Sequence, residues 1–202
     1  MGTTKKSTPK KSTVKTKTTK TTTKTVAKTT SKSSAKSAPV MSQAKQFWTA
    51  VFFVCCPLVV GTVASLLTMN AMTSFGALNQ PPLAPPAWLF PVAWTILYIL
   101  MGVASYLIFL APVRTKMDKS LRRAELILFF IQLAFNFCWT LFFFKFELRF
   151  FAFGWLIAMW LMIVALIVMT CKNRKAAMWL LVPYLLWCTF AAYLNISIAI
   201  LN

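Results

Sequence analysis

The sequence of 202 residues contains no histidine and only three acidic residues. Histidine is the commonest metal ligand and the commonest acid or base catalyst near neutral pH, so its absence excludes Ser-His-Asp hydrolases, HExxH metalloproteases and His-ligated haem proteins. The five cysteines, of which Cys55 and Cys56 are adjacent, match neither a metal-binding pattern nor a disulfide framework. Charged residues make up 12% of the chain and hydrophobic residues 58%, with a mean hydropathy of +0.68, so much of the folded surface must face an apolar solvent.

The first 45 residues have a composition unlike the rest of the chain. Lys, Thr and Ser make up 32 of them, with 12 Lys and no acidic or aromatic residue. Such a segment buries too little apolar area to offset the loss of chain entropy, and we predict that residues 1–45 form a disordered tail. The simplest interpretation is a solvated arm that contacts anionic lipid headgroups. An organelle transit peptide and a nucleic-acid-binding arm are alternatives, and nucleic acid is not an expected partner because charge alone supports it.

The remaining sequence contains five apolar segments, each long enough to cross a bilayer as a helix, which needs about 20 residues. They are longer than barrel strands and lack the alternation of barrel faces, so we predict an all-α bundle of five transmembrane helices over residues 46–202. The predicted spans are about 47–68, 88–111, 124–144, 150–170 and 176–201. Residues 69–87, between the first two, contain four prolines that interrupt a helix.

The basic residues that come after the tail are distributed unequally between the loops. Eight lie after the second and fourth predicted spans, whereas only Lys145 and Arg149 lie after the third. With five spans, these eight fall on the same side of the membrane as the tail, as the positive-inside rule requires. We therefore predict an integral, multi-pass membrane protein with its two ends on opposite sides, and with the N-terminus cytoplasmic if a translocon inserts the chain.

Three of the predicted helices each carry a stripe of polar and aromatic residues at helical spacing. The stripes are Trp94, Tyr98, Met101 and Ser105; Gln132, Asn136 and Trp139 or Thr140; and Tyr184, Trp187, Ala191 and Asn195. Formal charges lie outside the spans or at their margins, so an ion-coupled transporter is not expected. Such stripes commonly mediate helix packing in membranes. They can also converge on a cavity for a flat conjugated ligand, which aromatic rings would stack against.

The eight tryptophans fall into three groups by their depth in the predicted spans. Near span ends, Trp48, Trp88 and Trp179 are expected to be interfacial anchors. Deeper in the spans, Trp94, Trp139 and Trp187 are candidate ligand contacts. In the fourth span, Trp155 and Trp160 are expected either to pack or to face lipid.

Three segments occur in an order and spacing that resemble those of a known family. They are PPAWLFPVAWTILY at residues 85–98 with Met101-Gly102, QLAFNFCW at residues 132–139, and PYLLWCTFAAYLN at residues 183–195. Together they resemble motifs of the translocator protein / tryptophan-rich sensory protein (TspO/MBR) family. The resemblance covers about residues 50–202 and does not include the tail.

This resemblance implies a five-helix membrane bundle, often a homodimer, with a pocket under the first loop that accepts porphyrins, haem and synthetic aromatic ligands. By position, the pocket would contain Trp94, Asn136, Trp139, Ala191 and Leu194, with Tyr98 and Leu78 nearby. The polar stripes add Gln132 and Trp187 to these candidate ligand contacts. No catalytic residue, metal ligand or obligatory cofactor is predicted; porphyrin or haem is expected as a ligand, and the expected partners are the lipid bilayer and a small hydrophobic molecule, either a tetrapyrrole or a lipid.

The predicted function is therefore a membrane receptor or translocator for a flat hydrophobic ligand, with a role in transport or regulation. A light-dependent porphyrin-degrading enzyme and a membrane scaffold whose Lys-rich tail binds anionic lipid or nucleic acid are the alternatives. The chain departs from the family's usual first loop, with Ser74-Phe75 in place of Trp-Tyr, Leu83 in place of Trp and Gln80-Pro81 in place of Lys-Pro. The lost rings and cation disfavour the enzyme. The family's sterol-associated pattern is absent because Ile196 stands where a Tyr is needed, so cholesterol binding through it is not predicted.

Overall fold

The computed structural model of the chain describes residues 1–2, 42–75, 77–172 and 174–202. The tail predicted over residues 1–45 lies almost entirely outside these ranges. The described residues form five α-helices and one short π-helix, without a strand, which confirms the predicted all-α fold with five spans. The elements are α1 (Gln43–Phe75), α2 (Leu89–Phe109), α3 (Lys116–Thr140), η1 (Leu141–Lys145), α4 (Arg149–Thr170) and α5 (Lys175–Leu201).

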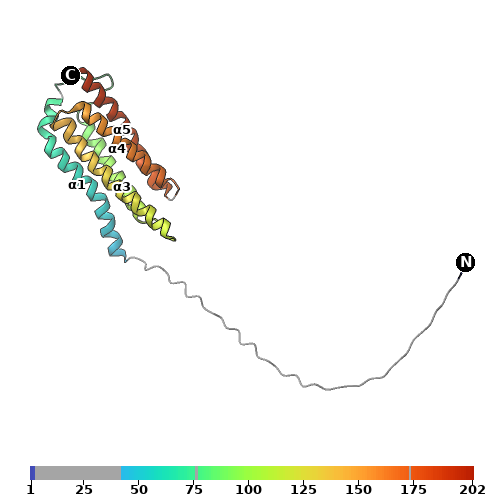
Figure 1. Cartoon of the computed structure of the whole chain (residues 1–202). Coiled ribbons are helices and arrows are strands. Elements are labelled where there is room, and N and C mark those ends of the chain that lie inside the picture. Colours follow the sequence, from blue (N-terminus) through green and yellow to red (C-terminus); the bar gives the residue numbers. More distant parts are fainter. Residues whose placement is uncertain (3–41, 76, 173) are drawn as a thin grey trace. The chain divides into compact units, whose positions relative to one another are not determined.

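The five helices lie side by side as an elongated bundle (Figure 1). The start of α1 and the C-terminus lie at opposite ends of this bundle, as an odd number of spans requires. Helix α1 packs on α2, α2 on α5, α5 on α4, and α4 on α3. Each of the five α-helices is long and apolar enough to cross a membrane.

Helix α1 is longer than the first predicted span, since it begins at Gln43 and continues to Phe75. The interrupting prolines start only at Pro81, so nothing in residues 69–75 stops the helix at its predicted end. The loop between α1 and α2 is held against α5. The backbone N–H of Asn79 donates to Asn202 Oδ1 (2.9 Å), Asn202 Nδ2 donates to the Asn79 carbonyl (3.2 Å), and the Tyr193 hydroxyl donates to the Pro82 carbonyl (2.6 Å).

The outer surface of the bundle is rich in large apolar side chains, which a soluble monomer would not expose in such number. Exposed Leu, Ile, Val and Phe residues occur on all five helices. Trp48, Trp88 and Trp179, the expected interfacial anchors, are each about two-thirds exposed (68%, 65% and 66%). A lipid solvent accounts for this surface, and the chain is an integral, multi-pass membrane protein.

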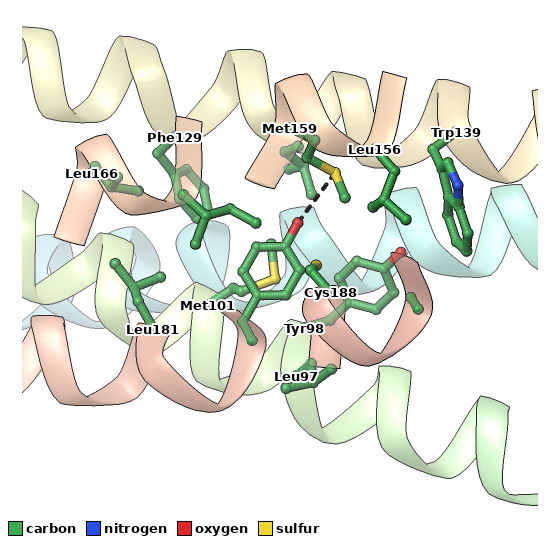
Figure 2. Close-up of a cluster of buried hydrophobic side chains, with 14 of the residues drawn as sticks. Leu97, Tyr98, Met101, Phe129, Trp139, Leu156, Met159, Leu166, Leu181 and Cys188 are labelled. Atoms are coloured by element: carbon green, nitrogen blue, oxygen red, sulfur yellow. Dashed lines mark hydrogen bonds between the residues drawn. The ribbon is translucent and has the colours of Figure 1, made fainter. Parts of the chain in front are cut away.

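The interior is filled by a continuous cluster of apolar side chains that runs along the bundle. Figure 2 shows Phe129, Leu166 and Leu181 at one end of this cluster and Leu156 and Trp139 toward the other.

Trp155 and Trp160 on α4 both take part in contacts between helices. The Trp155 ring stacks on Phe135 of α3 at 4.1 Å between centroids, and its indole N–H donates to the Phe135 carbonyl at 2.9 Å. The Trp160 indole N–H donates to the Thr189 hydroxyl of α5 at 2.9 Å. Of the two roles expected for this pair, packing is therefore the one that the contacts support.

Arginines complete the hydrogen bonding at the end of α2, whose last carbonyls have no partner within the helix. Arg122 Nη1 donates to the carbonyls of Phe109 (3.1 Å) and Ala111 (3.4 Å), and Arg174 Nη2 donates to the carbonyl of Leu110 (2.6 Å). Positive charge at a helix C-terminus also complements the helix dipole. The loop between α2 and α3 is thereby fastened at the end of the bundle that carries most basic residues.

Two acidic residues of α3 have different surroundings. At the start of the helix, Asp118 forms a capping box with Thr115, in which Asp118 Oδ2 accepts from the Thr115 N–H (2.9 Å) and the Asp118 N–H donates to Thr115 Oγ1 (3.1 Å). Glu125, at the margin of the predicted span, is only 2% exposed, and its Oε1 has no hydrogen-bond partner within the described residues. A single buried carboxyl does not form the chain of acids that a proton relay needs.

Helices α1 and α2 approach closely at Gly102. A Cβ added there would lie 2.6 Å from the Val54 Cα and 2.8 Å from the Phe53 carbonyl oxygen. Small residues at such crossings let membrane helices pack with their backbones in contact. Since backbone atoms cannot rotate out of the way, only glycine fits.

We expect Gly102→Ala to lower the free energy of unfolding by about 1–3 kcal/mol, the usual cost of overpacking. The measurement is the midpoint of thermal unfolding in detergent, followed by circular dichroism. Gly154→Ala on α4 is the matched control, because nothing lies within 4 Å of its added Cβ. Equal midpoints for both variants would contradict the close contact of α1 with α2.

Candidate functional site

A cavity of about 250 Å³ lies between α1, α2 and α5, with the junction of α3 and η1 as its remaining wall. Its lining contains no charged side chain. The lining comes from the second half of α1, the first half of α2, the end of α3 and the second half of α5. The cavity therefore lies in the half of the bundle away from the basic loops.

Six of the nine candidate residues line this cavity, and three do not. The six are Trp94, Tyr98, Trp139, Trp187, Ala191 and Leu194. Gln132 and Asn136 are fully buried and lie outside the lining, as members of the hydrogen-bond network that holds Tyr98. Leu78 is partly buried against the apolar core and does not line the cavity either.

Trp94 is the centre of an aromatic cluster on one wall of the cavity. Its ring stacks on Tyr98 at 5.6 Å between centroids and lies 6.1 Å from Trp139, 6.4 Å from Tyr184 and 6.4 Å from Trp187. These rings come from α2, α3 and α5, so the three stripes expected from the sequence do converge. Distances of this size are typical of favourable ring contacts.

A buried chain of side-chain hydrogen bonds joins α2, α3 and α5 beside this cluster. The Tyr98 hydroxyl donates to Asn136 Oδ1 (2.6 Å), Asn136 Nδ2 donates to the Tyr184 hydroxyl (3.2 Å), and that hydroxyl donates to Gln132 Oε1 (2.8 Å). The Tyr184 hydroxyl also lies 3.5 Å from the Met159 sulfur, the contact dashed in Figure 2. Asn136 and Gln132 therefore orient the aromatic wall, and the ligand contacts expected of them from the sequence stay predictions.

A second set of hydrogen bonds fixes Trp139. Its indole N–H donates to Asn195 Oδ1 on α5 (3.1 Å), and Asn195 Nδ2 donates to the Arg149 carbonyl at the start of α4 (2.8 Å). Because both polar ends of the Asn195 amide are engaged, the indole ring has a defined orientation at the cavity wall.

Helix α1 supplies a wall that the sequence-based prediction missed. Gly61, Ser65 and Thr68 line the cavity at spacings of four and three residues, which places them on one helical face. A Cβ added at Gly61 would overlap the ring of Tyr98, so glycine lets α1 lie directly against that ring. This stripe of small residues at helical spacing was the available signal in the sequence.

The threonine hydroxyls around the cavity are satisfied within their own helices. Thr62, Thr68, Thr95 and Thr140 each donate to the carbonyl four residues earlier, at 2.8 to 3.1 Å. Such local bonds leave the threonine methyl groups as the accessible surface. The cavity is therefore chemically apolar despite its hydroxyl-bearing residues.

The π-helix η1 shapes the end of the cavity. The Phe146 N–H donates to the Leu141 carbonyl at 2.9 Å, the i to i−5 bond of a π-turn. This turn places Phe143 in a stack with Trp139, with 5.6 Å between centroids and 17° between planes, and places Phe144 in the lining. Turns of this kind are rare and frequently occur at functional sites.

The described lining consists of apolar, aromatic and hydroxyl-bearing side chains. Among the described residues, the lining contains no Cys, Met or carboxylate, and the phenol hydroxyl of Tyr98 donates a hydrogen bond to Asn136 Oδ1. Within the described ranges, no group of three His, Cys, Asp or Glu residues could hold a metal ion. Trp187, which lines the cavity, has an indole N–H without a hydrogen-bond partner among the described residues.

Comparison with known proteins gives a consistent result. The sequence model of the TspO/MBR family matches residues 53–201. A tryptophan-rich protein TspO of Chlorobaculum tepidum is 37% identical, over 78% of this chain and 98% of that protein. Protein CrtK of Rhodobacter capsulatus is 34% identical over 76% of this chain and 91% of that protein, and a translocator protein of Ovis aries is 34% identical over 60% and 70%, respectively.

The hydrogen-bond network predicts the effect of Tyr184→Phe. Removal of this hydroxyl leaves Asn136 Nδ2 and Gln132 Oε1 unsatisfied in the interior, which should lower the free energy of unfolding by about 1–3 kcal/mol. Tyr106→Phe is the matched control, because the Tyr106 hydroxyl makes only a 3.5 Å contact with the Gln46 carbonyl. Denaturant titration of both variants in detergent measures the difference; a Tyr184→Phe protein as stable as the control would mean that the network contributes little.

Proposed function

This chain belongs to the TspO/MBR family and is an integral membrane protein with five transmembrane helices. From this we propose that its function is to bind a ligand. Its uncharged cavity binds a flat, conjugated hydrophobic molecule, of which a tetrapyrrole is the class that fits best. The observation that carries this proposal is the aromatic wall centred on Trp94, which offers ring faces from three helices to a planar guest.

The size of the cavity defines how such a guest would enter. A volume of about 250 Å³ lies at the lower end for ligand pockets, which are usually about 300–1,000 Å³. One edge of a tetrapyrrole ring would therefore lie among Trp94, Trp139 and Trp187. The rest of the ring would project toward the end of the bundle that lies away from the basic loops. Its carboxylates would remain at the membrane surface, since the lining holds no cation to pair with them.

The donor set of the lining favours recognition of the ring rather than of a bound iron. Haem iron is usually held by His, Cys, Met or Tyr. Tyr98 is the only such residue among the described lining residues, and its hydroxyl is hydrogen-bonded to Asn136. Stacking on the porphyrin plane, supplemented by the indole N–H of Trp187 toward a ring nitrogen or carbonyl, is the mode of binding that these residues support.

The biological role that we propose is reception or translocation of this ligand across or within the membrane. The name of the related ovine protein denotes translocation, and the absence of charged groups from the lining agrees with passive rather than ion-coupled movement. The basic end of the bundle would face the cytoplasm if a translocon inserts the chain. Light-dependent porphyrin breakdown and a scaffold role for the tail stay predictions from the sequence.

We expect Ala191→Phe to weaken binding of protoporphyrin at least about tenfold, which corresponds to about 1.4 kcal/mol, because the new ring fills the cavity. Saturable quenching of intrinsic tryptophan fluorescence in detergent measures the affinity without removing any tryptophan. Leu186→Phe is the matched control on α5, since Leu186 is 64% exposed on the outer surface. Unchanged affinity in a folded Ala191→Phe protein, or no saturable quenching of the native protein, would refute the proposal.

Binding through the ring predicts little dependence on a central metal. Protoporphyrin, its zinc complex and haem should bind within about threefold of one another, since no lining residue is free to serve as an axial ligand. Competition titrations with the three compounds test this. A preference of about tenfold or more for haem, together with a shift of its absorption band in the complex, would indicate iron ligation instead.

A further inference from the structure

A second concave surface lies on the outside of the bundle, at the end opposite the aromatic cavity. It is a groove of about 690 Å³ along α3, closed on one side by Phe109 at the end of α2. Its residues on α3 recur every three or four positions and so form one continuous stripe. They are Lys119, Arg122, Arg123, Leu126, Ile127, Phe130, Ile131 and Ala134.

The stripe divides sharply into a cationic end and an apolar end. Lys119, Arg122 and Arg123 occupy the first turns of α3, and only apolar residues of the groove lie beyond them, from Leu126 to Ala134. Lys119 and Arg123 are at least partly exposed. Three cations at the head of an apolar groove are complementary to a molecule with an anionic head and a hydrocarbon chain.

Arg122 is held in place before any ligand arrives. Its Nη1 donates to the Phe109 and Ala111 carbonyls, and its guanidinium carbon lies 5.8 Å from the centre of the Phe109 ring. These contacts engage Nη1 alone, and Arg122 also lines the groove. A guanidinium positioned in this way presents two adjacent donors, the geometry that matches a phosphate group.

The acidic residues of the chain leave these cations without a counter-ion. Asp118 Oδ2 accepts from the backbone N–H groups of Arg114 and Thr115, and Glu125 is buried. Glu147 pairs with Arg149 at 3.6 Å, beyond the far end of α3. Among the described residues, Lys119, Arg122 and Arg123 form no salt bridge.

The apolar part of the groove has the length of a lipid chain within one leaflet. Leu126 to Ala134 extends about 12 Å along the helix axis at about 1.5 Å per residue, and half of a bilayer's hydrocarbon core is about 15 Å. Ile127, Phe130 and Ile131 are 48%, 37% and 44% exposed and so are open to such a chain. The cations then lie at the depth of the lipid phosphates.

We propose that this groove binds an anionic phospholipid, with its phosphate on Lys119, Arg122 and Arg123 and an acyl chain along Leu126 to Ala134. A second copy of the protein is a poorer occupant. Two copies with the same orientation in the membrane would bring their like-charged clusters together across a two-fold axis, which costs free energy. The lipid site is separate from the aromatic cavity and does not depend on the function proposed for it.

The test compares lipid binding by the purified full chain in detergent, measured by native mass spectrometry. The probes are phosphatidylglycerol and phosphatidylcholine with identical acyl chains. The native protein should prefer phosphatidylglycerol about tenfold, given the contribution of each cation near a lipid phosphate. Lys119→Gln/Arg123→Gln should reduce this preference severalfold, to the residual selectivity that Arg122 alone provides.

The matched control is Arg114→Gln/Lys116→Gln, which removes two exposed cations from the same end of the bundle but outside the groove. This control should keep the native preference. Because the Lys-rich tail is present in every variant, it cannot account for a difference between them. Ala134→Trp, at an exposed position inside the groove, should weaken binding of the long-chain lipid without changing the thermal midpoint.

Several results would overturn the proposal. Equal binding of both lipids by the native protein would remove any anionic selectivity, and equal losses in both double variants would show diffuse surface attraction. Displacement of the lipid by glycerol 3-phosphate alone would indicate a simple anion site. A lipid-free dimer that Ala134→Trp disrupts would identify a second copy as the occupant of the groove.

Discussion

The constraint on which the rest of this structure depends is the absence of water from the bilayer core. Every buried amide and hydroxyl must find its partner inside the protein. The chain meets most of this requirement by linking Tyr98, Asn136, Tyr184 and Gln132 Oε1 in one series of hydrogen bonds across three helices, although Gln132 Nε2 has no partner among the described residues. The same bonds orient the rings beside the cavity. The polar groups that pair with one another inside the bundle are therefore also the groups that position the candidate site.

Much of the architecture could be predicted from the sequence because it is determined by properties of single segments of the chain. Apolar length and loop charge define five spans, and helical spacing brings Trp94, Trp139 and Trp187 to one interior region. Asn136 and Gln132 share those stripes but lie outside the cavity lining, since spacing indicates a face and not the depth of a side chain within it. The length of α1 was underestimated because the loop prolines begin only at Pro81 and leave the end of the helix undefined before that point, and because proline is tolerated within these helices, as Pro57 in α1 shows.

Two parts of the site could not be predicted in this way. The stripe of small residues on α1 signals a close-packed face, but the contact between Gly61 and the Tyr98 ring is evident only from the structure. The π-turn η1 has no established sequence signature, and it depends on how the end of α3 is accommodated against α1 and α4. Such features arise from contacts between segments distant in the chain.

The π-turn has a consequence for how this cavity could diversify. A π-turn contains one residue more than the α-helical turn it replaces, and deletion of that residue would rotate the downstream residues by about 100°. If the deleted residue preceded Phe143, Phe144 would take the direction in which Phe143 now points and Lys145 would take that of Phe144, while the polar pairs earlier in α3 would keep theirs. Single-codon insertions or deletions at this turn could therefore change the shape of the cavity during evolution, while the helices that precede the turn keep their packing.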